Sequence, residues 1–285
     1  MNNVFKSLMS AMLILALTVP LMGCGGGADS PVDYRITVCS DTDQPMEGIK
    51  VFVYEDETCA ELVSVATTDA TGTVAFTEKR SDSFTAVLKE VPAGYEARSG
   101  YTLEAGENRI TLTSRPLTDE EMAQLKLGLG DRFPELTVTD CAGTEHSLYT
   151  LLEQKKAVVL NFWYENCGPC KMEFPYLQEA YEAYGQDVEF LALNPVDGTD
   201  DSVRAYQTQQ NLTFPMAKCD IRWQDILQLT AYPTTVIVDR DGTIVLRHNG
   251  MVTDSEGLKN ALAYFTKADY QPTVFETFEE IPPAE

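Results

Sequence analysis

Residues 157–170 read AVVLNFWYENCGPC, an apolar run that ends in two cysteines separated by Gly168 and Pro169. Apart from Asn161, the run is apolar on both faces, which is typical of a central strand in a parallel sheet. Beyond the cysteines, large apolar residues recur at the spacing of one helix face. They are Phe174, Leu177, Tyr181 and Tyr184. The sequence therefore predicts a strand, a turn that holds both cysteines, and a helix.

This arrangement places Cys167 at the N-terminus of a helix. Unpaired backbone N–H groups and the helix dipole stabilise an anion there, so we expect a lowered pKa for the Cys167 thiol and a nucleophilic role. Cys170, one turn further on, is spaced to form a disulfide with Cys167. Pro169 suits the first helical turn because it has no N–H to leave unpaired. The predicted reactive group is a redox-active disulfide, with no other cofactor.

The same two cysteines could instead be half of a zinc site. Such a site needs a second cysteine pair or suitably spaced histidines. The chain has no second C-x-x-C pair, and its only histidines, His146 and His248, have no spaced partner. We therefore predict redox chemistry and no metal.

The motifs around the cysteines resemble the thioredoxin family. Phe162-Trp163 precede the pair, Lys171 follows it, and Tyr232-Pro233-Thr234-Thr235 come later in the chain. The likeness is closer to the extracytoplasmic TlpA- and ResA-like proteins, through four further motifs: Leu129–Pro134, the hairpin over 140–144, Glu173-Phe174-Pro175 and Phe214-Pro215. The resemblance covers nearly all of 129–265. It implies an α/β thioredoxin-like fold over 129–267, with a central mixed sheet flanked by helices.

The resemblance also implies a substrate-binding surface. Pro233 takes the place of the cis-proline that faces the active site. A cis X-Pro bond forces a sharp turn, which would expose the backbone of Tyr232 for pairing with an extended substrate peptide. We expect Trp163, Gly168 and Pro169 to line the same surface, with protein disulfides as substrates.

Glu173 is the expected proton acceptor. Thioredoxin has a buried aspartate on the strand before its first cysteine, and this chain has Asn161 there. The resolving thiol of Cys170 must still ionise before it attacks a mixed disulfide. Glu173 lies three residues after Cys170 on the same helix, as the matching glutamate does in ResA-like proteins. Because Gly-Pro between the cysteines resembles thioredoxin, whose potential is about −270 mV, we predict that the protein reduces protein disulfides.

The first 23 residues predict a lipoprotein signal peptide. Lys6 precedes an apolar run, and the run ends at Leu21-Met22-Gly23-Cys24, which resembles the bacterial lipobox. Cys24 would then carry the lipid, and 24–32 would form a flexible tether. The alternative is an ordinary cleaved signal with an incidental cysteine. The favoured interpretation places the protein outside the cytoplasm, lipid-anchored to the cell membrane, where the family implies a membrane thiol reductase as electron donor.

Residues 33–115 predict a small all-β sandwich. Short alternating strands are separated by turn residues, and we expect them to pair antiparallel. Gly48–Val51, Thr68–Gly72 and Val91–Tyr95 resemble the prealbumin-like Cna-B or SpaA repeats of Gram-positive surface proteins. Some of these repeats carry a Lys-to-Asn isopeptide bond; here Asn108 is present, but the first strand has Arg35 and no lysine, which argues against the crosslink. The favoured role is a spacer, and the alternative is a partner-binding module.

The remaining segments connect or end these domains. Residues 116–128 predict a linker with one short helix, in which Thr118 caps and Glu121 bonds back. Residues 268–285 contain several glutamates and two consecutive prolines, and they predict an acidic disordered tail.

Four cysteines outside the motif could form structural disulfides. Cys39 with Cys59 is the first candidate pair, and Cys141 with Cys219 is the second. Disulfides persist outside the cytoplasm, although sequence alone does not fix the pairing. The alternative for Cys141 and Cys219 is that both are small buried apolar residues.

Charge and spacing narrow the function classes. With 44 acidic and 21 basic residues the formal charge is −23, which disfavours nucleic acid as a partner. A peroxiredoxin-like peroxidase would need a Pro-x-x-x-Thr-x-x-Cys pattern, which is absent before Cys167, and a Sco-type copper carrier would need C-x-x-x-C. A further alternative is a cell-surface binding or scaffold protein with a passenger redox domain.

Overall fold

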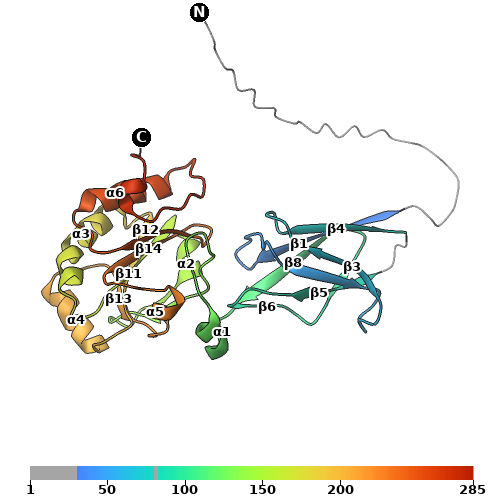
Figure 1. The fold of residues 1–285 in the computed structure, drawn as a ribbon, viewed down its shortest axis with the longest axis horizontal. Coiled ribbons are helices and arrows are strands. Elements are labelled where there is room, and N and C mark those ends of the chain that lie inside the picture. Colours follow the sequence, from blue (N-terminus) through green and yellow to red (C-terminus); the bar gives the residue numbers. More distant parts are fainter. Residues whose placement is uncertain (1–30, 80–82, 285) are drawn as a thin grey trace, which may run out of the picture.

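The computed structural model of the chain describes residues 31–79 and 83–284. The predicted signal peptide and Cys24 lie outside the described residues. Figure 1 shows an all-β body and a body of sheet and helices, connected through the short helix α1 (Asp119–Gln124). Within the described ranges, no helix has the length and hydrophobicity needed to cross a bilayer.

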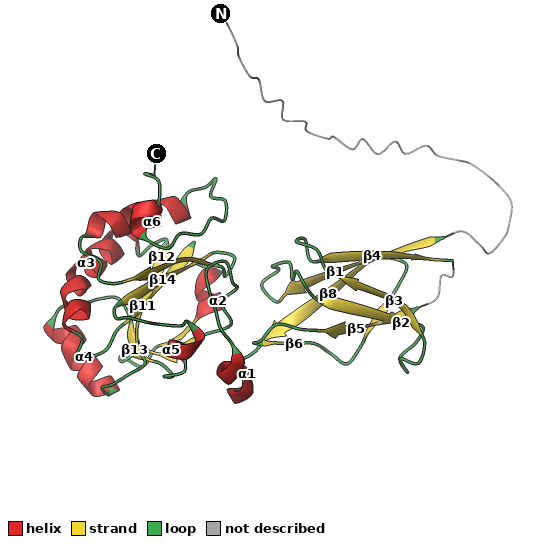
Figure 2. Cartoon of the chain, in the orientation of Figure 1, coloured by secondary structure: helices red, strands yellow, loops and turns green. Residues whose placement is uncertain are grey.

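The all-β body consists of two four-stranded sheets, ordered β4-β1-β8-β6 and β3-β2-β5-β7 (Figure 2). Its strands are β1 (Val32–Ser40), β2 (Lys50–Tyr54), β3 (Leu62–Thr67), β4 (Thr73–Glu78), β5 (Phe84–Lys89), β6 (Tyr95–Glu96), β7 (Tyr101–Leu103) and β8 (Gly106–Ser114). Alternate side chains such as Tyr34, Ile36 and Val38 point into one core, as the period of a strand requires. The predicted sandwich is confirmed.

One pairing in the sandwich differs from the antiparallel arrangement expected from the sequence. Strands β1 and β8 run parallel, with Ile36 opposite Asn108. A parallel pair needs a long connection, and here the strands β2 to β7, which belong to both sheets, lie between β1 and β8 in the chain. The Asn108 side chain donates to the carbonyls of Glu104 (2.8 Å) and Gly106 (3.1 Å), so it closes the turn between β7 and β8.

Helix α1 begins with the predicted capping box. The Thr118 hydroxyl accepts from the backbone N–H of Glu121 (3.2 Å), and the Glu121 carboxylate accepts from the backbone N–H of Thr118 (2.8 Å). Arg115 also holds both oxygens of Glu121 at 2.7 Å, which lowers the pKa of that carboxyl to about 2. Met122 and Leu127 are buried in the second domain, so this connector packs against the domain that follows it.

Strand β11 (Ala157–Phe162) lies at the centre of a five-stranded sheet of order β13-β12-β11-β14-β15. The other strands are β12 (Val188–Asn194), β13 (Met216–Lys218), β14 (Thr234–Asp239) and β15 (Ile244–Asn249), and a separate hairpin holds β9 (Thr137–Thr139) and β10 (Glu145–Ser147). Because β11 is parallel to β12 and antiparallel to β14, the sheet is mixed. The predicted thioredoxin-like arrangement is confirmed.

Helices cover both faces of this sheet (Figure 1). They are α2 (Leu148–Leu152), α3 (Gly168–Tyr184), α4 (Asp200–Gln209), α5 (Trp223–Ile226) and α6 (Ser255–Thr266). Val159 joins the core under α3, α4 and α6, while its neighbours Val158 and Leu160 join the core under α2 and α5. This alternation explains why β11 is apolar on both faces.

The C-terminal segment is ordered, so the predicted disordered tail is wrong. The backbone N–H of Phe275 donates to Val245 on β15 (2.9 Å), and a 3₁₀ turn, η1 (Phe278–Glu280), follows. The Phe278 ring packs on His248 with 4.7 Å between ring centroids, and Ile281 is 5% exposed. Three apolar residues spaced by three lie on one side of the segment and cover α6 and β15, while the glutamates between them are exposed. The apolar residues are Phe275, Phe278 and Ile281.

Arg132 connects the two bodies. Its Nε donates to the Tyr95 hydroxyl of the sandwich (3.1 Å), and its NH1 donates to the carbonyl of Asp241 in the turn between β14 and β15 (2.6 Å). The guanidinium also lies 4.9 Å from the centre of the Tyr149 ring, a cation–π distance.

The register of the sheet shows at which end of the second domain Arg132 makes its contact with the sandwich. Phe162, at the cysteine end of β11, is opposite Thr234, whereas Ala157 at the other end is opposite Asp239. The turn that Arg132 holds follows Asp239 directly. The sandwich is therefore attached at the end of the sheet that faces away from the cysteines.

Candidate active site

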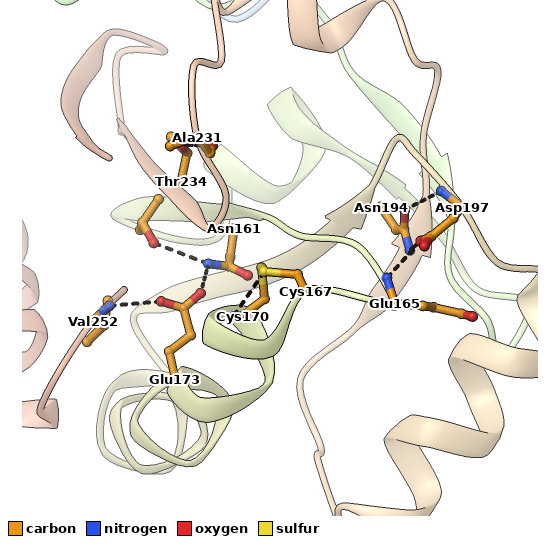
Figure 3. Close-up of a disulfide and its surroundings, with 11 residues drawn as sticks. Asn161, Glu165, Cys167, Cys170, Glu173, Asn194, Asp197, Ala231, Thr234 and Val252 are labelled. Atoms are coloured by element: carbon orange, nitrogen blue, oxygen red, sulfur yellow. Dashed lines mark hydrogen bonds between the residues drawn. A yellow bond between two sulfur atoms is a disulfide. The ribbon is translucent and has the colours of Figure 1, made fainter. Parts of the chain in front are cut away.

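Cys167 and Cys170 form a disulfide at the N-terminus of helix α3 (Figure 3). Cys167 is the N-cap residue, and its sulfur accepts from the backbone N–H of Cys170 at 3.1 Å. Gly168 and Pro169 form the exposed first positions of the helix, while Cys167 is 2% exposed and Cys170 is fully buried. A partner must therefore approach over the Gly-Pro turn, and Cys167 is the sulfur that it reaches.

Glu173 is completely buried one helical turn beyond Cys170. One carboxylate oxygen accepts from the Asn161 amide at 2.8 Å, and the other accepts from the backbone N–H of Val252 at 2.9 Å. Burial raises the pKa of Glu173 to about 7, because these two hydrogen bonds only partly compensate for lost hydration. Glu173 can therefore gain or lose a proton near neutral pH.

Asn161 orients the Glu173 carboxylate from the central strand. Its amide nitrogen donates to Thr235 at 3.2 Å as well as to Glu173, and Thr235 is its direct partner in the pairing of β11 with β14. The buried amide oxygen of Asn161 has no hydrogen-bond partner among the described residues. Asn161 stands where thioredoxin has its aspartate. In this chain the Asn161 side chain instead donates a hydrogen bond to the carboxylate of Glu173 on helix α3.

The Tyr232–Pro233 peptide bond is cis, as predicted. The carbonyl of Pro233 accepts from the backbone N–H of Gly250 at 2.9 Å. Gly250 and Val252 belong to one loop, so this loop contacts both the cis-proline turn and Glu173. The half-buried ring of Tyr232 meets that of Tyr164 edge to face, with 5.4 Å between centroids.

Trp163 does not line the substrate surface, contrary to the sequence-based expectation. It has no exposed surface, and its indole packs on Phe174 and Tyr206 with centroids 5.2 and 5.8 Å apart. Its place at the end of β11 directs the side chain into the core under α3 and α4. The next residue, Tyr164, is partly exposed beside Tyr232, and the sequence analysis did not single it out.

Asp197 is a second residue that the sequence analysis missed. Its carboxylate accepts from the backbone N–H of Glu165 (2.7 Å) and from the side-chain amides of Asn194 and Asn166 (both 3.1 Å). Burial acts to raise the pKa of Asp197, but these donors outweigh it and the pKa is lowered. Asp197 follows β12, far from the cysteines in sequence, so no local pattern connects it to them.

The first predicted structural disulfide is absent. Cys39 and Cys59 are both free. Cys39 is buried on β1, with its sulfur 3.6 Å from the carbonyl of Ile110 on β8. Cys59 lies in the loop between β2 and β3, which belong to the other sheet. The separation of the two sheets explains why these cysteines do not pair.

Cys141 and Cys219 are also free, which corrects the second predicted pair. The Cys141 thiol donates to the Gln207 side chain at 3.1 Å. Asp140 bridges to Ala217 in an antiparallel sense, and continuing this register places Cys219 opposite Val138 instead of Cys141. Cys141 is buried and Cys219 is partly buried against the core, which fits better the alternative interpretation that both are small residues of the interior.

Comparison with known proteins assigns the second domain to a family. Residues 129–247 match the model of the AhpC/TSA family. A thiol-disulfide oxidoreductase ResA from Bacillus thuringiensis subsp. konkukian (strain 97-27) is 33% identical over 152 residues, which cover 52% of this chain and 82% of that protein. The chain belongs to the ResA family of thiol-disulfide oxidoreductases. A ResA from Geobacillus kaustophilus is 36% identical over 136 residues, covering 46% of this chain and 74% of the relative.

Among solved structures, a thiol:disulfide interchange protein from a Bacteroides species is similar to this ResA-family chain, with 22% identity and a TM-score of 0.42. The match covers 50% of this chain and 93% of that protein. The predicted enzyme class is confirmed by the relatives: the chain is a thioredoxin-like thiol-disulfide oxidoreductase.

Proposed function

We propose that this oxidoreductase reduces protein disulfides outside the cytoplasm and is held at the membrane by a lipid on Cys24. The observation that carries the chemical part is the Cys167–Cys170 disulfide at the start of α3, with Glu173 buried behind it. The Gly-Pro pair between the cysteines supports the reducing direction, because thioredoxin, whose motif it resembles, has a potential of about −270 mV. The lipobox-like sequence supports the location.

The proposed reaction begins with the reduced dithiol. The Cys167 thiolate attacks one sulfur of a substrate disulfide; that S–S bond breaks, a mixed disulfide forms, and one substrate thiolate leaves. Glu173 takes the proton of the Cys170 thiol. The Cys170 thiolate then attacks the Cys167 sulfur and releases the second substrate thiolate. The enzyme ends as the oxidised Cys167–Cys170 pair, and two electrons have passed to the substrate.

The substrate peptide is proposed to lie across Gly168 and Pro169 against the Tyr232 backbone. Both helix residues are exposed, and Cys167 is the more accessible sulfur of the pair. The reaction requires a dithiol donor to reduce the enzyme again, and we propose a membrane thiol reductase as that donor.

The sandwich is proposed to act as a spacer related to the Cna-B or SpaA repeats. Its attachment through Arg132, at the end of the sheet opposite the cysteines, supports this role. In this position it leaves the surface over Gly168 and Pro169 open to large substrates.

The reduction potential of the Cys167–Cys170 pair tests the proposed direction. We expect a value near that of thioredoxin when the protein is equilibrated with dithiothreitol or glutathione buffers and free thiols are counted. A value near −120 mV, typical of a strong oxidant, would contradict the reductase assignment. In a parallel assay, Cys170→Ser should accumulate a mixed disulfide with a protein substrate, whereas Cys167→Ser should accumulate none.

The location has its own test. Incorporation of a labelled fatty acid into the full chain, and sedimentation of the protein with membranes, should both be lost in Cys24→Ala. Fatty-acid incorporation that persists in this variant would contradict lipidation at Cys24.

A further inference from the structure

The two residues before the nucleophile, Glu165 and Asn166, are held by a neighbouring segment of the chain. Figure 3 shows the contact of this segment with Glu165. The carboxylate of Asp197 accepts from the Glu165 backbone at 2.7 Å and from the Asn166 side chain at 3.1 Å. Asn194, at the end of β12, orients this carboxylate with its amide (3.1 Å), and its own side-chain oxygen accepts from the Asp197 backbone N–H (3.1 Å). One carboxylate therefore joins the ends of β11 and β12 directly beside Cys167.

Further contacts fix the position of Asp197. The ammonium group of Lys218, at the end of β13, donates to the carbonyls of Asp197 (2.9 Å) and Gly198 (2.7 Å). Gly198 has φ +78°, and a Cβ at this position would overlap the Glu165 carboxylate. Ser202 donates to that same carboxylate. The segment around Asp197 therefore lies close to the turn at Glu165 and Asn166. Residues from three elements, β12, β13 and the start of α4, fix this arrangement.

We propose that Asp197 is a positioning residue for thiol–disulfide exchange, which fixes the turn that presents Cys167 and keeps a negative charge on the residues that precede the thiolate. This inference rests on the proposed function, because it assumes that Cys167 is the attacking sulfur. Asp197 does not touch the sulfur; it acts through Glu165 and Asn166.

Two physical effects follow from this arrangement. In-line attack on a disulfide depends on the position of the Cys167 sulfur, so a loose turn would spread that sulfur over unproductive positions. The Asp197 carboxylate also repels the Cys167 thiolate, which disfavours the reduced form. The first effect speeds exchange, and the second makes the pair more reducing.

Two substitutions at Asp197 separate these effects. Asp197→Ala removes every acceptor of the side chain. Asp197→Asn keeps one oxygen for the Glu165 N–H and the Asn194 amide, and removes the charge together with the acceptor of the Asn166 amide. Asp201→Ala and Asp201→Asn are matched controls: Asp201 lies on the same segment, is 91% exposed, and pairs only with Arg204 among the described residues. The assays use the full chain and measure disulfide reduction, reduction potential, the pH dependence of Cys167 alkylation, and melting temperature.

We expect Asp197→Ala to lower kcat/KM for a protein disulfide about tenfold or more, while both Asp201 variants behave as wild type. Asp197→Asn should keep most of this activity. Its thiol should alkylate with a lower pKa, and its disulfide should be about threefold easier to reduce, which is about 14 mV toward the oxidising side.

The proposal would be overturned by an Asp197→Ala enzyme as active as Asp201→Ala, or by an Asp197→Asn protein with unchanged potential and unchanged Cys167 pKa. Activity losses that merely follow the melting temperatures, with no shift in potential, would also reject it and leave Asp197 a stabilising residue only. If instead the wild-type protein fails to reduce protein disulfides, the proposed function fails, while the potential and the alkylation profile still test Asp197.

Discussion

At the scale of single residues, the buried carboxylate of Glu173 determines how this domain responds to pH. Its pKa in the folded protein is about 7, against an ordinary value of 4.5. Below pH 4.5 Glu173 is protonated in both the folded and the unfolded protein. Between pH 4.5 and 7 the unfolded protein ionises this carboxyl while the folded protein keeps it protonated, so the free energy of unfolding falls by about 3 kcal/mol from this group. Above pH 7 the folded protein carries the buried charge, and the loss is complete.

We predict that Glu173→Gln removes this loss. The free energy of unfolding of the variant, relative to wild type, should rise by about 3 kcal/mol between pH 4 and pH 8. Urea denaturation of the oxidised protein across this pH range measures the difference. Glu182→Gln, an exposed change on the same helix, serves as control and should show no such trend. A constant difference between wild type and Glu173→Gln would mean that Glu173 does not titrate in this range.

Residue roles were predictable where local spacing determines them. The N-cap position of Cys167 and the direction of Glu173 follow from their places on one helix. The burial of Trp163 and the contacts of Asp197 did not follow, because both depend on how separate strands and helices pack. Free Cys39 and Cys59 show the same limit, since their separation is set by the sheet to which each belongs.

At the scale of elements, the C-terminal segment behaves as part of the second domain. Phe278 is 7% exposed and covers the ring of His248, whose pKa is lowered mainly by burial. We predict that Phe278→Ala lowers the free energy of unfolding by about 3 kcal/mol and moves the pKa of His248 up toward its ordinary value. Val274→Ala, on a side chain that is 47% exposed, should change neither quantity.

Urea denaturation and a histidine NMR titration measure both effects. If wild type and Phe278→Ala were equally stable, the segment would not pack against the domain, and the disordered tail predicted from the sequence would be correct. The sequence contains a signal for its packing, three apolar residues spaced by three. The glutamates between them obscured it, since composition alone averages over the two sides of the segment.

At the scale of the whole molecule, the two bodies are connected at the end of the sheet away from the cysteines. Arg132 bonds to Tyr95 on one side and to Asp241 on the other. We predict that Arg132→Ala loosens the relative orientation of the bodies and leaves the reduction potential unchanged. Small-angle scattering should show a broader distribution of sizes for this variant, and Arg35→Ala, an exposed change within the sandwich, should not. A shift in potential would mean that the sandwich influences the disulfide.

An enzyme that exchanges disulfides is exposed to its own chemistry, because any thiol it carries can become a competing nucleophile. Burial raises the pKa of Cys141, and it raises the pKa of Cys219 to about 12. A raised pKa keeps these thiols protonated at neutral pH, whereas the thiolate is the attacking species. The fold thereby protects Cys141 and Cys219 from disulfide exchange, although neither of them is held in a structural disulfide.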